Sequence, residues 1–345
     1  MEIDLNTRKL INKTCKGKNK IKLTIGTFAA DKSTIYVFDD TGEVVNEDYI
    51  YEIGSITKTF TASLLAKSIY NGSMSLDDQI STYIDGLDSK RYYPTLKRLI
   101  THTAGYPGFL PLTKTDNFKY IMTMIFGGKK EGVFPFHLDL DNMKRLLNKY
   151  SLKDKDYPWK YSNFGFALIG YAISMKEGRN FKEIMDSFIS EELCLKNSFT
   201  GTSPGRNLRG YNSRNNDIGN WIWGDDLTAP AGDISSTASD LLEYARIIMY
   251  EEIPYLNLYN QKYTIVSHPF FNDCDMGFGW LLYKSDNNII WHNGGTGAFR
   301  SFLSIDKGKK HAVVILSNYF VNTDKIGHMI LNSLSKCGDY YQRSK

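Results

Sequence analysis

The chain has 345 residues, of which 42% are hydrophobic and 23% charged, a composition typical of a globular protein with an ample core. Its formal net charge of +4 is mild, and no basic motif with interleaved aromatic residues indicates a nucleic-acid partner. No apolar stretch is long enough for a membrane span. Because the first residues also lack the pattern of a signal peptide, we expect a cytoplasmic protein.

The four cysteines are far apart in the sequence and include no C-x-x-C pair: Cys15, Cys194, Cys274 and Cys337. This spacing indicates neither a disulfide framework nor a metal-ligand cluster. We therefore expect free thiols in a reducing compartment, no bound metal and no cofactor.

In chain order, the basic residues Lys16, Lys18, Lys20 and Lys22 are interpreted as a solvated arm. Strands are predicted over 22–28 and 33–39, with a hairpin turn signal at 39–42. A second set of strands is predicted over 278–284, 289–292, 299–305 and 311–316, and the middle of the chain is mainly helical. The two ends are therefore expected to meet in one antiparallel sheet. The sheet lobe would cover about 20–65 and 261–345, and a helical lobe about 66–260.

The segment 55–58, Ser-Ile-Thr-Lys, follows Gly54 and opens a helix predicted to end near Asn71. Ser55 and Lys58 would share one helical face, and a serine hydroxyl needs such a basic neighbour to become a nucleophile. The first helical turn and burial both disfavour an ammonium, so Lys58 is expected to be neutral enough to accept a proton. The helix is expected to be amphipathic, with an apolar stripe made of Ile56, Phe60, Leu64, Leu65 and Ile69.

This motif is weak by itself, because Ser-x-x-Lys recurs at Ser304/Lys307 and Ser333/Lys336. The first repeat runs from a strand pattern into a turn, and the second lies in a polar C-terminal helix. An isolated match is more typical of an N-cap serine with a surface lysine. Two further motifs downstream distinguish Ser55 from these repeats.

The second motif is Tyr161-Ser162-Asn163, which lies between a loop and an apolar helix over 164–171. Such junctions often project side chains into a cleft. A tyrosine near a lysine can exist as a phenolate or relay protons, and the asparagine amide can position Lys58 and a substrate carbonyl. Alone, the motif is equally typical of a buried tyrosine beside a helix cap, since Tyr-x-Asn recurs at 255–257.

The third motif, His292-Asn293-Gly294, leads a β-rich run into a glycine cluster that lets backbone approach a ligand closely. The N–H of Gly295 would pair with that of Ser55 as an oxyanion hole. His292 would point into the cleft as a hydrogen-bond donor or proton shuttle. The alternative is a β-bulge or hairpin with a structurally bonded histidine.

Together the three motifs resemble the serine β-lactamase and penicillin-binding protein superfamily. The Tyr-Ser-Asn form resembles its class C branch, with the related esterases, D-aminopeptidases and DD-peptidases. The resemblance runs from about residue 20 to 335 and includes the segments 54–62, 99–105, 230–238, 277–280 and 315–318. It implies a single domain, 1–345, with a β-lactamase/transpeptidase-like α/β (α+β) fold: an antiparallel sheet flanked by helices, plus a mostly helical lobe, with the active site between them.

The resemblance also implies roles for individual residues. Ser55 would be the nucleophile and Lys58 the group that helps to deprotonate it, while Tyr161 would be the general base for acylation and the acid toward the leaving group. Asn163 and His292 would orient the substrate. The backbone N–H groups of Ser55 and Gly295 would form the oxyanion hole.

His102 lies in a segment, 101–105, that resembles a structural turn of the family, so it is left out of the catalytic set. Two stretches are expected to shape substrate choice: 109–135 as a lid or cleft wall, and 210–226, with Trp221 and Trp223, as a lining of the acyl or leaving-group pocket. Ordinary surface loops with core-anchoring aromatic residues are the alternative for both.

The chain departs from the family at His292, where β-lactamases and DD-peptidases normally carry a lysine that helps to bind the substrate carboxylate. A neutral imidazole offers little charge at neutral pH. We therefore expect a serine hydrolase of esters or amides, acting on a small molecule or short peptide. The alternatives are a penicillin-binding DD-peptidase or class C-type β-lactamase, and a penicillin-binding sensor without turnover. Exported relatives are common, and the oligomeric state stays open.

Overall fold

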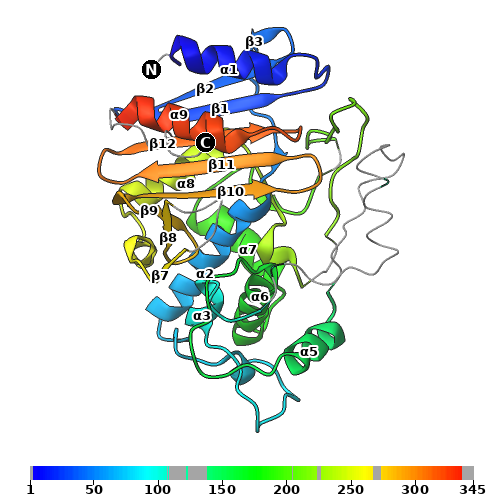
Figure 1. Ribbon diagram of the computed structural model, residues 1–345, viewed down its shortest axis with the longest axis vertical. Helices are drawn as coiled ribbons and strands as arrows, with labels where there is room; N and C mark the ends of the chain where they lie inside the picture. Colours follow the sequence, from blue (N-terminus) through cyan, green and yellow to red (C-terminus); the bar gives the residue numbers. More distant parts are fainter. Residues whose placement is uncertain are drawn as a thin grey trace.

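The computed structural model describes residues 3–106, 108, 122, 138–203, 205–223, 227–266 and 273–335. These residues form a sheet lobe, at the top of Figure 1, and a helical lobe below it. The expected lid or cleft wall over 109–135 falls almost entirely outside the described residues.

The sheet lobe is built on a sheet whose nine described strands follow the order β3-β2-β1-β12-β11-β10-β9-β8-β7. Every neighbouring pair is antiparallel. The pairing of β1 with β12, with Leu23 opposite Ser317, confirms that the two ends of the chain share one antiparallel sheet. The strands are β1 (Leu23–Ala29), β2 (Lys32–Asp39), β3 (Gly42–Val44), β7 (Thr264–Ile265), β8 (Cys274–Met276), β9 (Leu281–Tyr283), β10 (Asp286–Gly295), β11 (Arg300–Asp306) and β12 (His311–Ser317).

Helices cover both faces of this sheet. On β12, Val313 and Ile315 join the core beneath α1 (Leu5–Cys15) and α9 (Thr323–Ser335), while Val314 and Leu316 join the core on the opposite side. There α8 (Ala238–Met249) packs against β1 and β12. Because both faces are buried, the central strands read as continuous apolar runs. These runs are what made the strands predictable.

The four lysines interpreted as a solvated arm lie between α1 and β1, directly after a helix that the sequence interpretation did not include. Residues 5–15 form α1, which is capped by the Asp4 carboxylate and packs against α9 and β2. The side chains of Lys16 and Lys20 are exposed, but Lys22 lies 3.2 Å from the Asp39 carboxylate. The segment is an integral layer of the sheet lobe.

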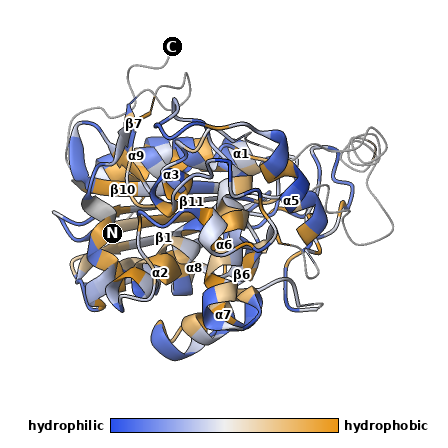
Figure 2. Cartoon of the chain, turned by 90° about the horizontal axis from the view of Figure 1, so that it is seen from below, coloured by the Kyte–Doolittle hydropathy of each residue, from blue (hydrophilic) through white to orange (hydrophobic). Residues whose placement is uncertain are grey.

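The helical lobe contains several helices (Figure 1), and a separate three-stranded sheet has the order β4-β6-β5. In Figure 2 the hydrophobic colouring concentrates on the strands and on the central helices α2 and α6. The helices are α2 (Thr57–Tyr70), α3 (Leu96–Ile100), α5 (Leu140–Lys149), α6 (Asn163–Glu177) and α7 (Phe181–Ser187), and the small strands are β4 (Tyr51–Glu52), β5 (Phe199–Thr200) and β6 (Ile234–Ser236). Shorter helical turns are η1 (Gly54–Ile56), η2 (Ile80–Thr82), η3 (Phe188–Glu192), η4 (Ala229–Ala231) and η5 (Pro254–Asn260).

The expectation of an amphipathic helix after Ser55 is wrong, because α2 is buried on all sides from Thr57 to Ala66. Its buried hydroxyl groups donate hydrogen bonds to carbonyl oxygens. Thr61 Oγ1 donates to Pro230 O at 2.8 Å, and Ser63 Oγ donates to Thr59 O at 3.0 Å. Hydroxyl groups satisfied in this way can be buried as readily as apolar groups.

The strand boundaries around the third motif also differ from the expectation. Of the predicted strand over 278–284, only β9 is extended, because Gly277 N–H donates to Trp280 O at 2.8 Å and Gly279 has a φ of +74°. By contrast, β10 continues past His292 as far as Gly295, which pairs with Arg300 of β11. The third motif therefore lies on a strand.

Three cysteines lie in the described part of the chain, and all are free: Cys15 and Cys274 are buried, and Cys194 is exposed. Cys337 lies outside it. None of the described helices is both long and apolar enough to cross a bilayer.

A tight helix contact gives the first testable prediction. A Cβ on Gly170 of α6 would lie 2.0 Å from Pro230 Cγ of η4, whereas a Cβ on Gly165 of the same helix would meet its nearest neighbour at 3.4 Å. Gly170→Ala should lower the free energy of unfolding by about 1–3 kcal/mol through overpacking. Gly165→Ala, the matched control, should be neutral or stabilising because alanine favours helix. Equal urea midpoints for the two variants would contradict this packing.

Candidate active site

Ser55 lies in the short turn η1, which connects strand β4 to the buried helix α2. The turn depends on Gly54, whose φ of +52° is in the left-handed region that favours glycine. Ser55 is half-buried. Its position thus follows from a local reversal of the backbone directly before a rigid helix.

Lys58 follows Ser55 by three residues and is completely buried. Its Nζ lies 3.1 Å from Ser55 Oγ and donates to Ala231 O of η4 at 2.6 Å. The rings of Tyr161 and Phe166 lie 4.9 and 5.6 Å from Nζ. Burial lowers the pKa of Lys58 well below its usual value, as the sequence predicted. A neutral amine at this distance can accept a proton from the serine hydroxyl.

Tyr161 precedes the N-terminus of α6, which is fixed by Ser162: the Ser162 Oγ accepts a hydrogen bond from Gly165 N–H at 3.0 Å. The Tyr161 side chain interacts with that of Ser55. Burial raises the pKa of Tyr161 above its ordinary value, and the interaction with Ser55 opposes this only in part. Of the two states considered from the sequence, the protonated relay is therefore favoured over the phenolate.

Asn163 is the first residue of α6, and its backbone N–H donates to Gly108 O at 3.1 Å. The side chain is half-buried. It forms no hydrogen bond to another described residue, so its role in orienting Lys58 or a substrate stays a prediction.

The backbones of Ser55 and Gly295 lie against each other. A Cβ on Gly54 would be 2.5 Å from Gly295 N, and a Cβ on Gly294 would be 3.0 Å from Ser55 N. Any side chain at Gly54 or Gly294 would push the backbone around Ser55 away from the backbone around Gly295. Ser301 of β11 adds a clamp, because its Oγ donates to Ile53 O at 2.7 Å. The structure therefore brings together the two N–H groups expected to bind an oxyanion.

His292 lies on β10 with its ring centroid 6.4 Å from that of Tyr161 and is buried. Burial and the nearby Lys58 lower its pKa to about 3, so the imidazole is neutral. Nδ1 lies 2.6 Å from the carbonyl oxygen of Asn293, which can only accept, so Nδ1 carries the proton. Nε2 is then a hydrogen-bond acceptor. Of the two roles expected from the sequence, donation through Nε2 is not available in this tautomer, and the proton shuttle stays a prediction.

Asn293 is itself held from the other side of the sheet. Its Nδ2 donates to the Asp324 carboxylate of α9 at 2.7 Å. The contact links the third motif to a helix close to the C-terminal end of the described chain. Because the backbone carbonyl of Asn293 fixes the His292 tautomer, this bond helps to set the character of the site.

Glu52 was not identified from the sequence. It lies on β4, three residues before Ser55, and is 3% exposed. Its Oε1 accepts a hydrogen bond from Trp221 N–H at 3.0 Å. Burial raises its pKa to about 7, while the neighbouring Thr296 hydroxyl and Trp221 N–H partly oppose this. The only sequence signal was a carboxylate inside an apolar run before Gly54.

The stretch 210–226 contributes Trp221 and Trp223, which are buried and meet edge to face with centroids 5.8 Å apart. A Cβ on Gly297 would lie 2.8 Å from Trp221 Nε1, and one on Gly232 would lie 2.6 Å from the Trp223 ring. The two side chains thus anchor this stretch beside the β10–β11 turn. Their expected role in lining a substrate pocket stays a prediction.

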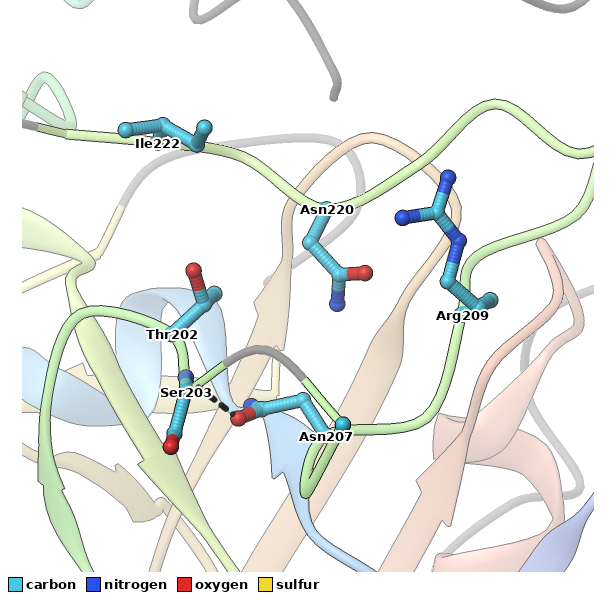
Figure 3. A pocket seen from close by; sticks show the side chains of 7 residues that line it. Thr202, Ser203, Asn207, Arg209, Asn220 and Ile222 are labelled. Carbon is cyan, nitrogen blue, oxygen red and sulfur yellow. Dashed lines mark hydrogen bonds between the residues drawn. The ribbon is translucent and has the colours of Figure 1, made fainter. Parts of the chain in front are cut away.

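A small polar cavity of about 80 Å³ opens beside this stretch (Figure 3). Ser203 and Asn207 form one side and are joined by a 2.8 Å hydrogen bond from Ser203 N–H to Asn207 Oδ1. On the other side, Arg209 is paired with Asp217 at 3.0 Å. The guanidinium charge is therefore already compensated.

The two other Ser-x-x-Lys matches have no comparable surroundings. Ser304 is buried on β11, and Lys307 pairs with Glu251 at 3.1 Å. Ser333 lies on α9, and Lys336 lies outside the described residues. Within the described part of the chain, no group of three or more His, Cys, Asp or Glu side chains could hold a metal ion.

Comparisons with known proteins place the chain among proteins of one family and fold. A family model described as Beta-lactamase matches residues 31–330. A β-lactamase of Pseudomonas fluorescens is 24% identical over 350 residues, which cover 86% of this chain and 88% of that relative.

Two solved structures show the same fold. The octameric penicillin-binding protein homologue from Pyrococcus abyssi has a TM-score of 0.77 at 19% identity, covering 97% of this chain and 78% of that one. The beta-lactamase/D-alanine carboxypeptidase from Pseudomonas syringae has a TM-score of 0.75 at 18% identity, covering 97% and 99%. The expected β-lactamase/transpeptidase-like architecture is confirmed.

The buried carboxyl of Glu52 predicts a pH-dependent stability. Its pKa of about 7 in the folded chain lies above its ordinary value of 4.5, so the folded state binds more protons between these values. Stability from this group is therefore lost as pH rises from about 4.5 to 7. Glu52→Gln should abolish this loss and gain up to about 3 kcal/mol relative to the parent between pH 5 and 8. Urea unfolding at both pH values measures it.

The control for this prediction is Glu177→Gln, which alters an exposed glutamate at the end of α6. It should leave the pH dependence of unfolding as in the parent. Parallel stability curves for Glu52→Gln and the parent would show that the Glu52 carboxyl does not titrate in this range.

Proposed function

This chain belongs to the family described as Beta-lactamase, and on that premise we propose that it is a serine hydrolase that cleaves an ester or amide through an acyl-enzyme on Ser55. The substrate is a small molecule or short peptide. The observation that carries the proposal is the fully buried Lys58 amine, with a lowered pKa, 3.1 Å from Ser55 Oγ. A lysine that was buried for packing alone would not need its amine at hydrogen-bond distance from a serine hydroxyl.

In the first step, Ser55 Oγ attacks the substrate carbonyl carbon while its proton passes to the neutral Lys58 Nζ. The carbonyl oxygen becomes an oxyanion and is stabilised by the N–H groups of Ser55 and Gly295. The carbon–leaving group bond then breaks as the leaving atom takes a proton. An ester of Ser55 and a free alcohol or amine result.

Tyr161 relays this proton. Its side chain interacts with that of Ser55 and its ring lies 4.9 Å from Lys58 Nζ, so it can give its own proton to the leaving group and recover one from Lys58. With its pKa raised, Tyr161 is a weak proton acceptor in the resting site. We therefore assign the base to Lys58 and the relay to Tyr161. Water completes the cycle by attacking the acyl-enzyme along the same route in reverse.

His292 makes the site selective. Because the imidazole is neutral and its Nε2 is an acceptor, it provides no cation for a substrate carboxylate. It instead favours a substrate with a hydrogen-bond donor, such as an amide N–H or a hydroxyl, at this position. This supports an esterase or amidase over an enzyme that requires the carboxylate of a β-lactam.

The competing function is that of a β-lactamase or D-alanine carboxypeptidase, as named for the Pseudomonas syringae protein of the same fold. A third possibility is a penicillin-binding module that is acylated but not deacylated. All three begin with acylation of Ser55, and they differ in the acyl donor and in turnover.

Intact-protein mass after brief exposure to p-nitrophenyl butyrate, with nitrophenol release followed in parallel, tests the proposal. We expect a burst, a mass increase of one acyl group and continued turnover, all absent in Ser55→Ala. Benzylpenicillin serves as the second probe. Faster turnover of penicillin than of the ester would favour the β-lactamase, and a stable penicilloyl adduct would favour the sensor. No adduct with either probe would contradict the proposed function.

The assignment of base and relay predicts different variant behaviour. Lys58→Met fills the buried space without an amine and should slow acylation by about 10³-fold or more, while Tyr161→Phe should slow it by about 10²-fold. Only the neutral amine accepts a proton, so the acylation rate of the parent should fall as pH is lowered through the pKa of Lys58. Near-normal rates in Lys58→Met would contradict the assignment.

The role of His292 predicts a change of selectivity. His292→Lys should raise the rate of acylation by benzylpenicillin relative to that by p-nitrophenyl butyrate, since the lysine restores a cation for the carboxylate. His292→Gln is the matched neutral control and should leave this ratio low. An unchanged ratio in His292→Lys would show that another group sets the selectivity.

A further inference from the structure

His102 follows α3 and has a φ of +60°, which is uncommon for residues other than glycine. The backbone around it is fixed by hydrogen bonds from His102 N–H to Leu99 O at 3.2 Å and from Thr103 N–H to Arg98 O at 2.9 Å. Such conformations persist only where the surroundings impose them, and they often mark functional sites. The strained turn therefore calls for a specific explanation.

Two hydrogen bonds join His102 to the segment that carries Tyr161. The His102 carbonyl oxygen accepts from Lys160 N–H at 2.9 Å, and the imidazole Nδ1 accepts from Ser162 N–H at 3.2 Å. They are made to the residues directly before and after Tyr161. Hydrogen bonds to the carbonyl oxygen and to the side chain of His102 thus fix the chain on both sides of Tyr161.

The imidazole also supports the Tyr161 ring. The two ring centroids are 4.7 Å apart, and those of Phe166 and Trp159 lie 5.3 and 5.9 Å from that of His102. His102 is 2% exposed. The tyrosine ring therefore contacts the buried imidazole, and the Lys58 amine lies 4.9 Å from the centroid of the same ring.

The nitrogen atoms of His102 explain why a histidine is needed. Burial, Lys58 and His292 lower its pKa well below the usual value, so the ring is neutral. Because Nδ1 accepts a hydrogen bond, the proton lies on Nε2, which is buried and has no hydrogen-bond partner among the described residues. A phenylalanine would fill this space without an unsatisfied N–H group. What it lacks is the Nδ1 acceptor.

We propose that His102 is a positioning residue, whose Nδ1 and ring hold Tyr161 in contact with Ser55 and Lys58. The proposal rests on the proposed function, because it assigns to His102 the alignment of the proton relay. It acts through Tyr161 and touches no substrate. A displacement of about 1 Å of a reacting group can reduce a rate by about 10²-fold.

Three variants separate the features of the side chain. His102→Asn keeps an acceptor close to the position of Nδ1 and is the substitution that best adopts a positive φ. His102→Gln carries its amide further out, and His102→Phe keeps the ring without an acceptor. Acylation by p-nitrophenyl butyrate should stay within about fivefold of the parent in His102→Asn and fall by roughly 10–100-fold in the other two. The loss should appear in kcat, with KM little changed.

A double-mutant cycle with Tyr161→Phe distinguishes positioning from general damage. If His102 acts only through Tyr161, His102→Phe should cause almost no further loss once the tyrosine hydroxyl is absent. Additive losses would overturn the proposal, because they would mean that His102 supports the fold in general. Equal rates in His102→Phe and the parent would also overturn it.

Hydrogen exchange provides a readout that does not depend on activity. Peptides containing the Ser162 amide should exchange faster in His102→Phe and His102→Gln than in the parent and in His102→Asn. If the parent is never acylated, the proposed function fails, and this exchange pattern alone decides whether His102 holds the Tyr161 segment. Unchanged exchange in all three variants would show that it does not.

Discussion

The arrangement of groups around Ser55 depends on the exclusion of water from the Lys58 amine. Lys58 lies in α2, a helix buried from Thr57 to Ala66, and its Nζ meets a carbonyl oxygen, a serine hydroxyl and two aromatic rings. Removing an ammonium from water is so unfavourable that the group loses its proton instead. This requires packing from both lobes. A Cβ on Gly279 of the sheet lobe would be 2.5 Å from Ala62 Cβ, and α6 packs on the other side.

The same packing places the proposed oxyanion donors, the N–H groups of Ser55 and Gly295, on rigid elements. Gly295 ends a long strand that is hydrogen-bonded within the main sheet, and Ser55 lies in the turn that leads into α2. Two glycines allow the backbones to touch, and Ser301 fastens the strand to Ile53. Donors held in this way need no rearrangement when the negative charge forms, which is the main source of their catalytic effect.

The sequence revealed what depends on near neighbours. Spacing placed Ser55 beside Lys58, and continuous apolar runs located the central strands. The burial of α2 was not predictable, since Thr61 is satisfied by a carbonyl 169 residues away. The hydrogen bond by which His102 supports the Tyr161 segment joins it to Ser162, 60 positions away. The tautomer of His292 depends on the carbonyl of Asn293, whose side chain is held by α9. Such contacts leave no local pattern in one sequence.

Four of the described ionisable groups near Ser55 share one electrostatic character. Burial moves the pKa values of Lys58, His292 and His102 downward and that of Tyr161 upward, so each group is held in its neutral form. In the proposed mechanism the oxyanion is then the charge that these groups leave room for, and in a dry environment oriented dipoles would stabilise it strongly. Glu52, whose carboxyl interacts with Thr296, also has a pKa shifted toward its neutral form. Its raised pKa keeps a negative charge away from Gly295 on the acid side of neutrality. Arg300 is the exception, since a Cβ on Gly295 would lie 2.8 Å from its Nη1 and the guanidinium donates to Thr296 O at 2.9 Å. Among the described residues, the fixed cation nearest the proposed oxyanion donors is therefore Arg300 and not the residue of the third motif.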